Sequence, residues 1–171
     1  MPSKEICMNL KDLSLEERHK IKKRLGIYAA LCKTAVVICL FLICAFSLLP
    51  AKNVPHTNIF PLGDKGAHAI AYIGLGMFAF LSISFSLIRK HLLNQKINEV
   101  KETLFATLHV LLIGIPLGLI IEIIQAKVGR NFDLFDWLAD SVGLLIGCII
   151  AAIINKLVVT YIIKKVSVVS K

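Results

Sequence analysis

The sequence lacks the cysteine content of a disulfide-rich scaffold, with five cysteines in 171 residues, and neither an internal repeat nor a low-complexity segment is present. Four of the five cysteines lie in apolar stretches: Cys32, Cys39, Cys44 and Cys148. A thiol in such a stretch behaves as a small hydrophobic group, so we do not expect a disulfide framework. The lack of an inverted repeat also argues against a carrier built from two related halves.

Acidic residues are few as well, with 11 Asp and Glu against 20 Lys and Arg, which gives a formal net charge of +9. A strongly basic protein often binds nucleic acid through a basic surface. Here the basic residues lie in short stretches between long apolar runs. We therefore expect no nucleic-acid partner, and interpret the basic stretches as signals that orient the chain in a membrane.

Apolar residues make up 57% of the 171 residues, and the mean hydropathy is +0.77. A soluble core of this size could not hide so much apolar surface. The apolar runs predict four membrane spans, at residues 27–49, 66–88, 104–125 and 134–155. Each is close to the ~20 residues that cross ~30 Å of hydrocarbon, where the backbone must bond within its own helix. The expected fold class is all-α: a polytopic membrane protein with a bundle of four transmembrane helices.

Lys and Arg outside these spans alternate in number along the chain: seven, two, four, two and four. The positive-inside rule then places both termini in the cytoplasm. The chain thus divides into a basic cytoplasmic leader (1–26), a transmembrane domain (27–163) and a cytoplasmic tail (164–171). Ser14 and Glu17 have the spacing of a capping box, which predicts a short amphipathic helix on the membrane surface. A loosely ordered basic leader is the alternative, and its length argues against a cleaved signal peptide.

Ionisable side chains gather at the predicted outer ends of the second, third and fourth spans. The candidate site residues are Asp64, Lys65, His68, Glu122, Gln125, Arg130, Asp133, Asp136 and Asp140. Residues four apart share one face of a helix, as Asp64 and His68 do, with Tyr72 a further turn on. A charge at the bilayer centre costs ~2.5–3.5 kcal/mol on insertion scales, so we expect Glu122 and Asp140 to face the bundle interior.

The cluster carries an excess of negative charge. Its five carboxylates face two fixed cations, Lys65 and Arg130, which leaves a formal charge of −3 with His68 neutral. A bound divalent cation, protonated carboxylates or a cationic substrate headgroup would each balance this excess. The carboxylates suit Mg²⁺, Ca²⁺ or Mn²⁺, and His68 would admit Zn²⁺, but no HExxH spacing selects a metal. The cofactor therefore stays open.

Several of these residues also have simpler interpretations. Arg130 paired with Asp133 or Asp136 would form an exposed ion pair worth ~0–1 kcal/mol and without a function. Trp137 and Tyr72 are alternatively anchors at the membrane interface. Glycines at small-xxx-small spacing favour packing within the bundle over dimerisation, and the oligomeric state stays open. They are Gly114, Gly118, Gly143 and Gly147.

Three short motifs follow one another within residues 63–147. The first is Asp64, Lys65, Gly66, Ala67 and His68, followed by Tyr72 and Gly74; the second is Gly118, Glu122 and Gln125; the third is Arg130, Asp133, Asp136 and Gly143. In these motifs the sequence resembles the VanZ-like family, small bacterial membrane proteins named for a member associated with resistance to the glycopeptide teicoplanin. That family usually has Asn where this chain has Asp140, a change that adds a charge and removes two hydrogen-bond donors.

The resemblance implies a protein of the bacterial cytoplasmic (inner) membrane that acts on the cell envelope, and it specifies no reaction. The first hypothesis is an enzyme that modifies the headgroup of an outer-leaflet membrane lipid or lipid-linked envelope precursor and so affects glycopeptide susceptibility. Glu122 or His68 would be the general base, and Lys65 and Arg130 would clamp a phosphate. The alternative is a non-enzymatic binder or shield of an envelope lipid or an amphiphilic antibiotic.

Overall fold

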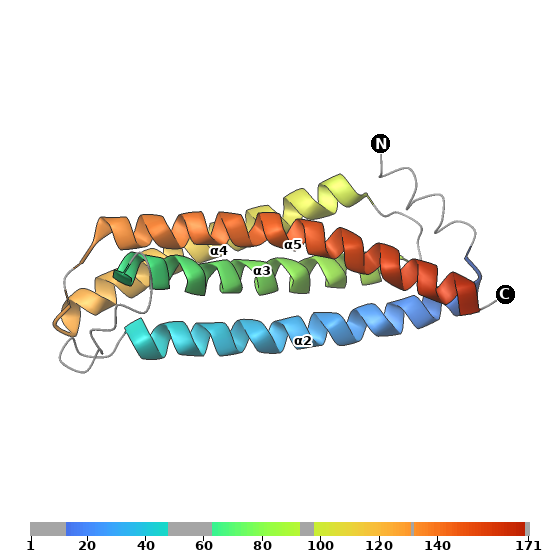
Figure 1. Cartoon of the computed structure of the whole chain (residues 1–171), viewed down its shortest axis with the longest axis horizontal. Helices are drawn as coiled ribbons and strands as arrows, with labels where there is room; N and C mark the ends of the chain where they lie inside the picture. Colours follow the sequence, from blue (N-terminus) through green and yellow to red (C-terminus); the bar gives the residue numbers. More distant parts are fainter. Residues whose placement is uncertain (1–12, 48–62, 93–97, 131, 170–171) are drawn as a thin grey trace.

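The computed structural model describes residues 13–47, 63–92, 98–130 and 132–169, without the side chains of residues 63–65 and 166–169. Those ranges form four α-helices and no strand: α2 (Leu15–Ser47), α3 (Gly63–His91), α4 (Glu99–Lys127) and α5 (Leu134–Val169). The helices run along the long axis of one elongated bundle, and the start of α2 and the end of α5 lie at the same end of it (Figure 1). The all-α prediction is confirmed.

All four helices are long and apolar enough to cross a membrane. The candidate spans are Leu15–Ser47, Gly66–His91, Glu99–Lys127 and Leu134–Lys165. Many large apolar side chains point outward, such as Phe41 and Leu112, which are 70% and 71% exposed. Such a surface suits lipid and not water. The prediction of a four-helix transmembrane bundle is therefore confirmed, while the cytoplasmic placement of the termini stays a prediction.

Helix α2 begins inside the segment that we expected to form a separate surface helix. Its first turn has the predicted capping box, because the Ser14 backbone N–H donates to Glu17 Oε2 (2.7 Å) and the Glu17 N–H donates to Ser14 Oγ (3.2 Å). The helix then continues through Gly26 without a break. One glycine costs only ~1 kcal/mol in a helix, too little to end a helix of this length. The helix thus continues past residue 26, as α5 continues past residue 164, and the division into leader, transmembrane domain and tail stays a prediction.

Replacing Ser14 by Ala removes one half of the capping box and should lower the free energy of unfolding by about 1 kcal/mol. Thermal denaturation of the purified protein in detergent would measure this loss. Lys20→Ala is the matched control, because the Glu16–Lys20 ion pair (2.7 Å) lies on the exposed surface of the same helix end. Exposed pairs of this kind are screened by water and contribute little, so a loss in Lys20→Ala as large as in Ser14→Ala would contradict the prediction.

Helices α3 and α5 pack most extensively against each other, and glycine makes their contact close. A Cβ on Gly143 would lie 2.6 Å from the carbonyl oxygen of Ala69, and one on Gly147 would overlap the carbonyl oxygen of Ile73. These glycines serve packing within the bundle, as their spacing predicted. Because Ala69 follows His68 directly, the same contact fixes the start of α3 against the start of α5.

Candidate functional site

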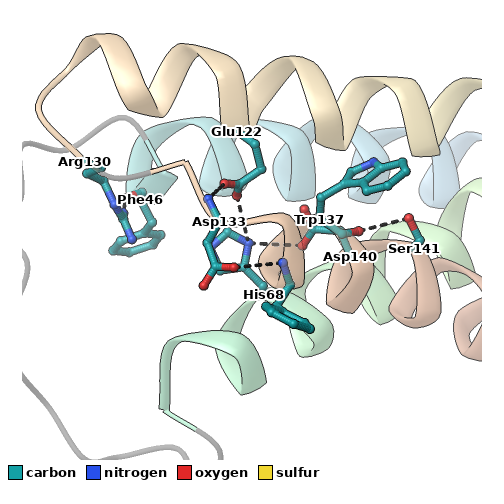
Figure 2. Close-up of polar contacts among 9 residues, drawn as sticks. Phe46, His68, Glu122, Arg130, Asp133, Trp137, Asp140 and Ser141 are labelled. Atoms are coloured by element: carbon teal, nitrogen blue, oxygen red, sulfur yellow. Dashed lines mark hydrogen bonds and ion pairs between the residues drawn. The ribbon is translucent and has the colours of Figure 1, made fainter.

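Three helices bring three ionisable side chains together at one end of the bundle. His68 comes from the start of α3, Glu122 from the end of α4 and Asp140 from the start of α5. His68 Nδ1 lies 3.1 Å from Asp140 Oδ1 and 4.0 Å from Glu122 Oε1 (Figure 2). Glu122, Asp140 and His68 are 0%, 1% and 8% exposed. This group is the candidate site, and it lies at the end of the bundle opposite the start of α2 (Figure 1).

The short connection between α4 and α5 holds Glu122 beside the start of α5. Gly129 has φ +86°, a left-handed conformation that glycine adopts without strain, and this turn reverses the chain. Asp133 then caps α5, because its Oδ1 accepts a 2.8 Å hydrogen bond from the Phe135 N–H. The Asp133 backbone N–H in turn donates a long hydrogen bond to Glu122 Oε2 (3.4 Å). Asp133 therefore positions the site through its backbone.

Gly118 and Trp137 fix the distance between α4 and α5 at the site. A Cβ on Gly118 would lie 3.3 Å from Asp140 Oδ2, so glycine leaves room for this carboxylate. The Trp137 indole N–H donates to the backbone carbonyl of Ile115 across the same helix pair (3.0 Å). Trp137 thus links α5 to α4 by a hydrogen bond. The sequence had indicated only that Trp137 could be an anchor at the membrane interface.

Two buried polar atoms around the site, Glu122 Oε1 and Gln125 Nε2, have no hydrogen-bond partner among the described residues. Tyr72 OH and Asp140 Oδ2 form no hydrogen bond of good geometry but lie close enough to interact with each other. Tyr72 is 1% exposed and interacts electrostatically with both Asp140 and Glu122, so it belongs to the site and is not an interface anchor. An unpartnered buried polar group costs about 1–3 kcal/mol, and a bound water, ion or ligand would recover that cost.

The remaining candidate residues lie at different distances from this centre. Asp136 is buried and acts electrostatically on both Glu122 and Asp140. Arg130 lies apart from His68, with its guanidinium donating to the backbone carbonyl of Phe46 (3.5 Å; Figure 2). Asp64 and Lys65 belong to the first turn of α3, and their side chains lie outside the described part of the structure. The predicted phosphate clamp therefore stays a prediction.

A second polar pair, which the sequence analysis did not identify, lies toward the other end of the bundle. Half-buried His91 places its Nδ1 2.8 Å from Oε1 of the buried Glu102, and Glu102 lines a cavity of about 100 Å³. The two residues flank the short connection between α3 and α4, a placement visible in the sequence. We expected only basic, orienting residues there. The pair offers a chemically matched comparison for the candidate site, with one carboxylate in place of two.

The site offers three possible metal ligands, one donor atom from each of His68, Glu122 and Asp140. These three atoms lie within 4.8 Å of one another, a spacing compatible with a shared metal ion. The imidazole and the two carboxylates are equally suited to moving a proton. Tyr72 and Gln125 add a hydroxyl and an amide that can orient a bound group. The site can thus support acid–base or metal-assisted chemistry in surroundings that exclude bulk water.

The comparisons with known proteins agree with the motifs noted in the sequence. A model of the VanZ/LLP1 family matches residues 33–155, well over half of the chain, and includes α3, α4 and the part of α5 that carries Asp140. No curated protein and no solved structure matches the chain. From this match and its four apolar helices, the chain belongs to the VanZ/LLP1 family and is a multi-pass membrane protein.

Proposed function

We propose that this protein modifies the headgroup of an envelope lipid or lipid-linked precursor in the bacterial cytoplasmic membrane. The observation that carries the proposal is the burial of His68 with two carboxylates, Glu122 and Asp140, within 4.0 Å of its ring inside an apolar bundle. Ionisable residues inside membrane segments are costly, and they usually mark a functional site. A site at this depth is suited to a group that arrives from the membrane.

An apolar groove of about 390 Å³ supports an amphiphilic substrate. It lies between α2, α3 and α4, because α2 packs along α3 and makes only slight contact with α4. The groove includes Gly114 and Leu144, which lie one helical turn from Gly118 and Asp140. From there it continues along α4 to His109, about 8 Å further at 1.5 Å per residue and about 20 Å from Glu122, so it reaches past the middle of a ~30 Å hydrocarbon layer. An acyl or prenyl chain would lie in this groove with its headgroup at the site.

The chemistry that this geometry supports is attack by a water or hydroxyl oxygen on the headgroup. Glu122 Oε1, which has no hydrogen-bond partner among the described residues, or His68 would accept the proton of the attacking oxygen. The same group would return that proton to the leaving oxygen. Asp140 holds the imidazole of His68 in position. Lys65, three residues before His68, or Arg130, once released from Phe46, would neutralise a phosphate.

The site is proposed to face away from the cytosol, as the positive-inside rule indicates. In a chain whose native cysteines are replaced, Asp64→Cys should react with a membrane-impermeant thiol reagent added to intact cells. Lys171→Cys, in the predicted cytoplasmic tail, should react only after the cells are permeabilised. Labelling of position 171 but not position 64 in intact cells would reverse the topology and contradict an outer-leaflet substrate.

Comparative lipidomics and cell-wall precursor analysis of cells with and without the protein test the proposed reaction. We expect at least one lipid or lipid-linked species whose mass changes only when the active protein is present. The same strains should differ in teicoplanin susceptibility. Identical lipid and precursor masses in both strains would overturn the enzymatic proposal.

The groove also favours a second candidate, a non-enzymatic binder or shield of an envelope lipid or an amphiphilic antibiotic. An apolar groove next to a few polar groups is sufficient for binding such a molecule. Purified protein would then bind the molecule saturably and release it with its mass unchanged. A product of altered mass would exclude this candidate.

A further inference from the structure

We infer that His68, Glu122 and Asp140 together bind one divalent transition-metal ion, of the Zn²⁺ or Mn²⁺ kind. The inference deepens the proposed function, on which it rests for its catalytic meaning, by assigning a cofactor to the same site. With the ion bound, His68 and Glu122 would be its ligands, and a water held by the ion would take the place of the base named above. Metal binding itself can be measured without a substrate.

Geometry provides the first argument, because the three donors come from three different helices and converge. The donor atoms lie within 4.8 Å of one another, and His68 Nδ1 is 3.1 Å from Asp140 Oδ1. Metal–ligand distances of about 2.0–2.2 Å place the donors around one ion about 3–4 Å apart. Small side-chain rotations would close the difference. Tight glycine contacts between α3 and α5 hold His68 and Asp140 in register.

An unpartnered carboxylate oxygen provides an independent argument. Glu122 Oε1 is buried and has no hydrogen-bond partner among the described residues, so its lone pairs are available. The Tyr72 hydroxyl is buried beside Asp140, interacts with both carboxylates and lies near hydrogen-bond distance of Asp140, whose second carboxylate oxygen keeps a lone pair for an ion. It could hydrogen-bond to a water held by the ion. A three-ligand site with a position left for water is the arrangement of catalytic metal centres.

Charge and donor type decide the class of metal. Two carboxylates and a neutral imidazole carry a formal charge of −2, which a divalent ion balances. Ca²⁺ takes six to eight oxygen ligands, and Mg²⁺ binds through carboxylates and waters, so the imidazole nitrogen of His68 among the three donors disfavours both. Imidazole with carboxylate suits first-row transition metals. This assignment goes beyond the sequence, which left Mg²⁺, Ca²⁺, Mn²⁺ and Zn²⁺ open.

Metal content of the purified, intact chain tests the inference. The protein, prepared in detergent without a polyhistidine tag, is stripped with a chelator, dialysed against Zn²⁺ or Mn²⁺ and analysed by elemental mass spectrometry. We expect about one ion per chain. Glu122→Gln and Asp140→Asn should each weaken binding at least tenfold, since even the loss of outer-shell partners costs 10–100-fold.

Glu102→Gln is the matched control, because it removes a buried carboxylate paired with His91 toward the other end of the bundle. It should bind the ion as tightly as the unmodified protein. Circular dichroism checks that each variant stays helical. The unmodified protein also gives a test that needs no variant: the ion should raise its melting temperature, and Co²⁺ should show visible absorption that Zn²⁺ abolishes.

Two results would overturn the inference: less than a tenth of an ion per chain after loading, or equal affinity in Glu122→Gln, Asp140→Asn and the unmodified protein. The proposed function fails separately. If the protein binds one ion but changes no lipid, the metal site is supported and the enzymatic proposal is contradicted. If the protein modifies lipid fully after chelation, the enzymatic proposal is supported and a catalytic role of the metal is contradicted.

Discussion

Glu122→Gln should lower the lipid-modifying activity by about 10²- to 10⁴-fold, the usual contribution of a positioned acid or base. Glutamine has nearly the same shape and keeps an oxygen that can accept the 3.4 Å hydrogen bond from the Asp133 N–H. It removes only the charge and basicity of a side chain that is fully buried beside His68 and Asp140. Product formed per amount of protein in reconstituted bilayers, measured by mass spectrometry, gives the comparison.

The control for this experiment is Glu102→Gln, which makes the same chemical change next to His91. Its activity should stay within about twofold of the unmodified protein, since Glu102 lies toward the other end of the bundle. Both variants should elute from a sizing column as the unmodified protein does. Full activity in Glu122→Gln, or an equal loss in both variants, would remove Glu122 from the proposed site.

Gly147→Ala should destabilise the bundle by about 3 kcal/mol, the upper part of the range for overpacked sites. A Cβ at this position would overlap the carbonyl oxygen of Ile73 and lie 2.8 Å from the backbone N of Met77. Both atoms belong to the backbone of α3, so α3 and α5 must separate to make room. At about 2–4 °C per kcal/mol for chains of this size, the melting temperature should fall by roughly 6–12 °C.

Gly74→Ala is the control, because it introduces the same methyl group into α3 with only Cys39 Sγ nearby, at 3.9 Å. Both substitutions gain about 1 kcal/mol of helix propensity, so the difference between them isolates the packing cost. Activity should fall with stability in Gly147→Ala, since the α3–α5 contact also holds His68 against Asp140. Equal melting temperatures for the two variants would show that these helices are not in close contact in the folded protein.

Hydropathy and local spacing were sufficient to predict the architecture but not the ends of the helices. Four apolar runs gave four helices, and the spacing of Ser14 and Glu17 gave the first turn of α2. The helices are longer than the predicted spans because hydropathy measures contact with lipid, whereas a helix ends only where its backbone bonding stops. Polar segments such as residues 18–24 and 160–165 continue the helix outside the apolar run.

The candidate site could be predicted only in part. Gly118 and Glu122 are four residues apart and therefore lie on one face of α4. Asp136 and Asp140 lie on one face of α5 for the same reason. Which helix faces meet depends on how the helices cross. The close glycine contacts that set this crossing involve residues far apart in the sequence, so local spacing does not predict them. For this reason the burial of Tyr72 and the contact of Arg130 with the Phe46 carbonyl were not foreseen.

The slight contact between α2 and α4 has a kinetic consequence. A substrate that reaches the site along the groove between these helices arrives by two-dimensional diffusion in the bilayer. The reaction rate then depends on the mole fraction of the substrate in the bilayer and not on its molar concentration. Adding detergent or inert lipid would dilute the substrate at constant total amount and slow the reaction in proportion. An enzyme supplied from the aqueous phase would be indifferent to this dilution.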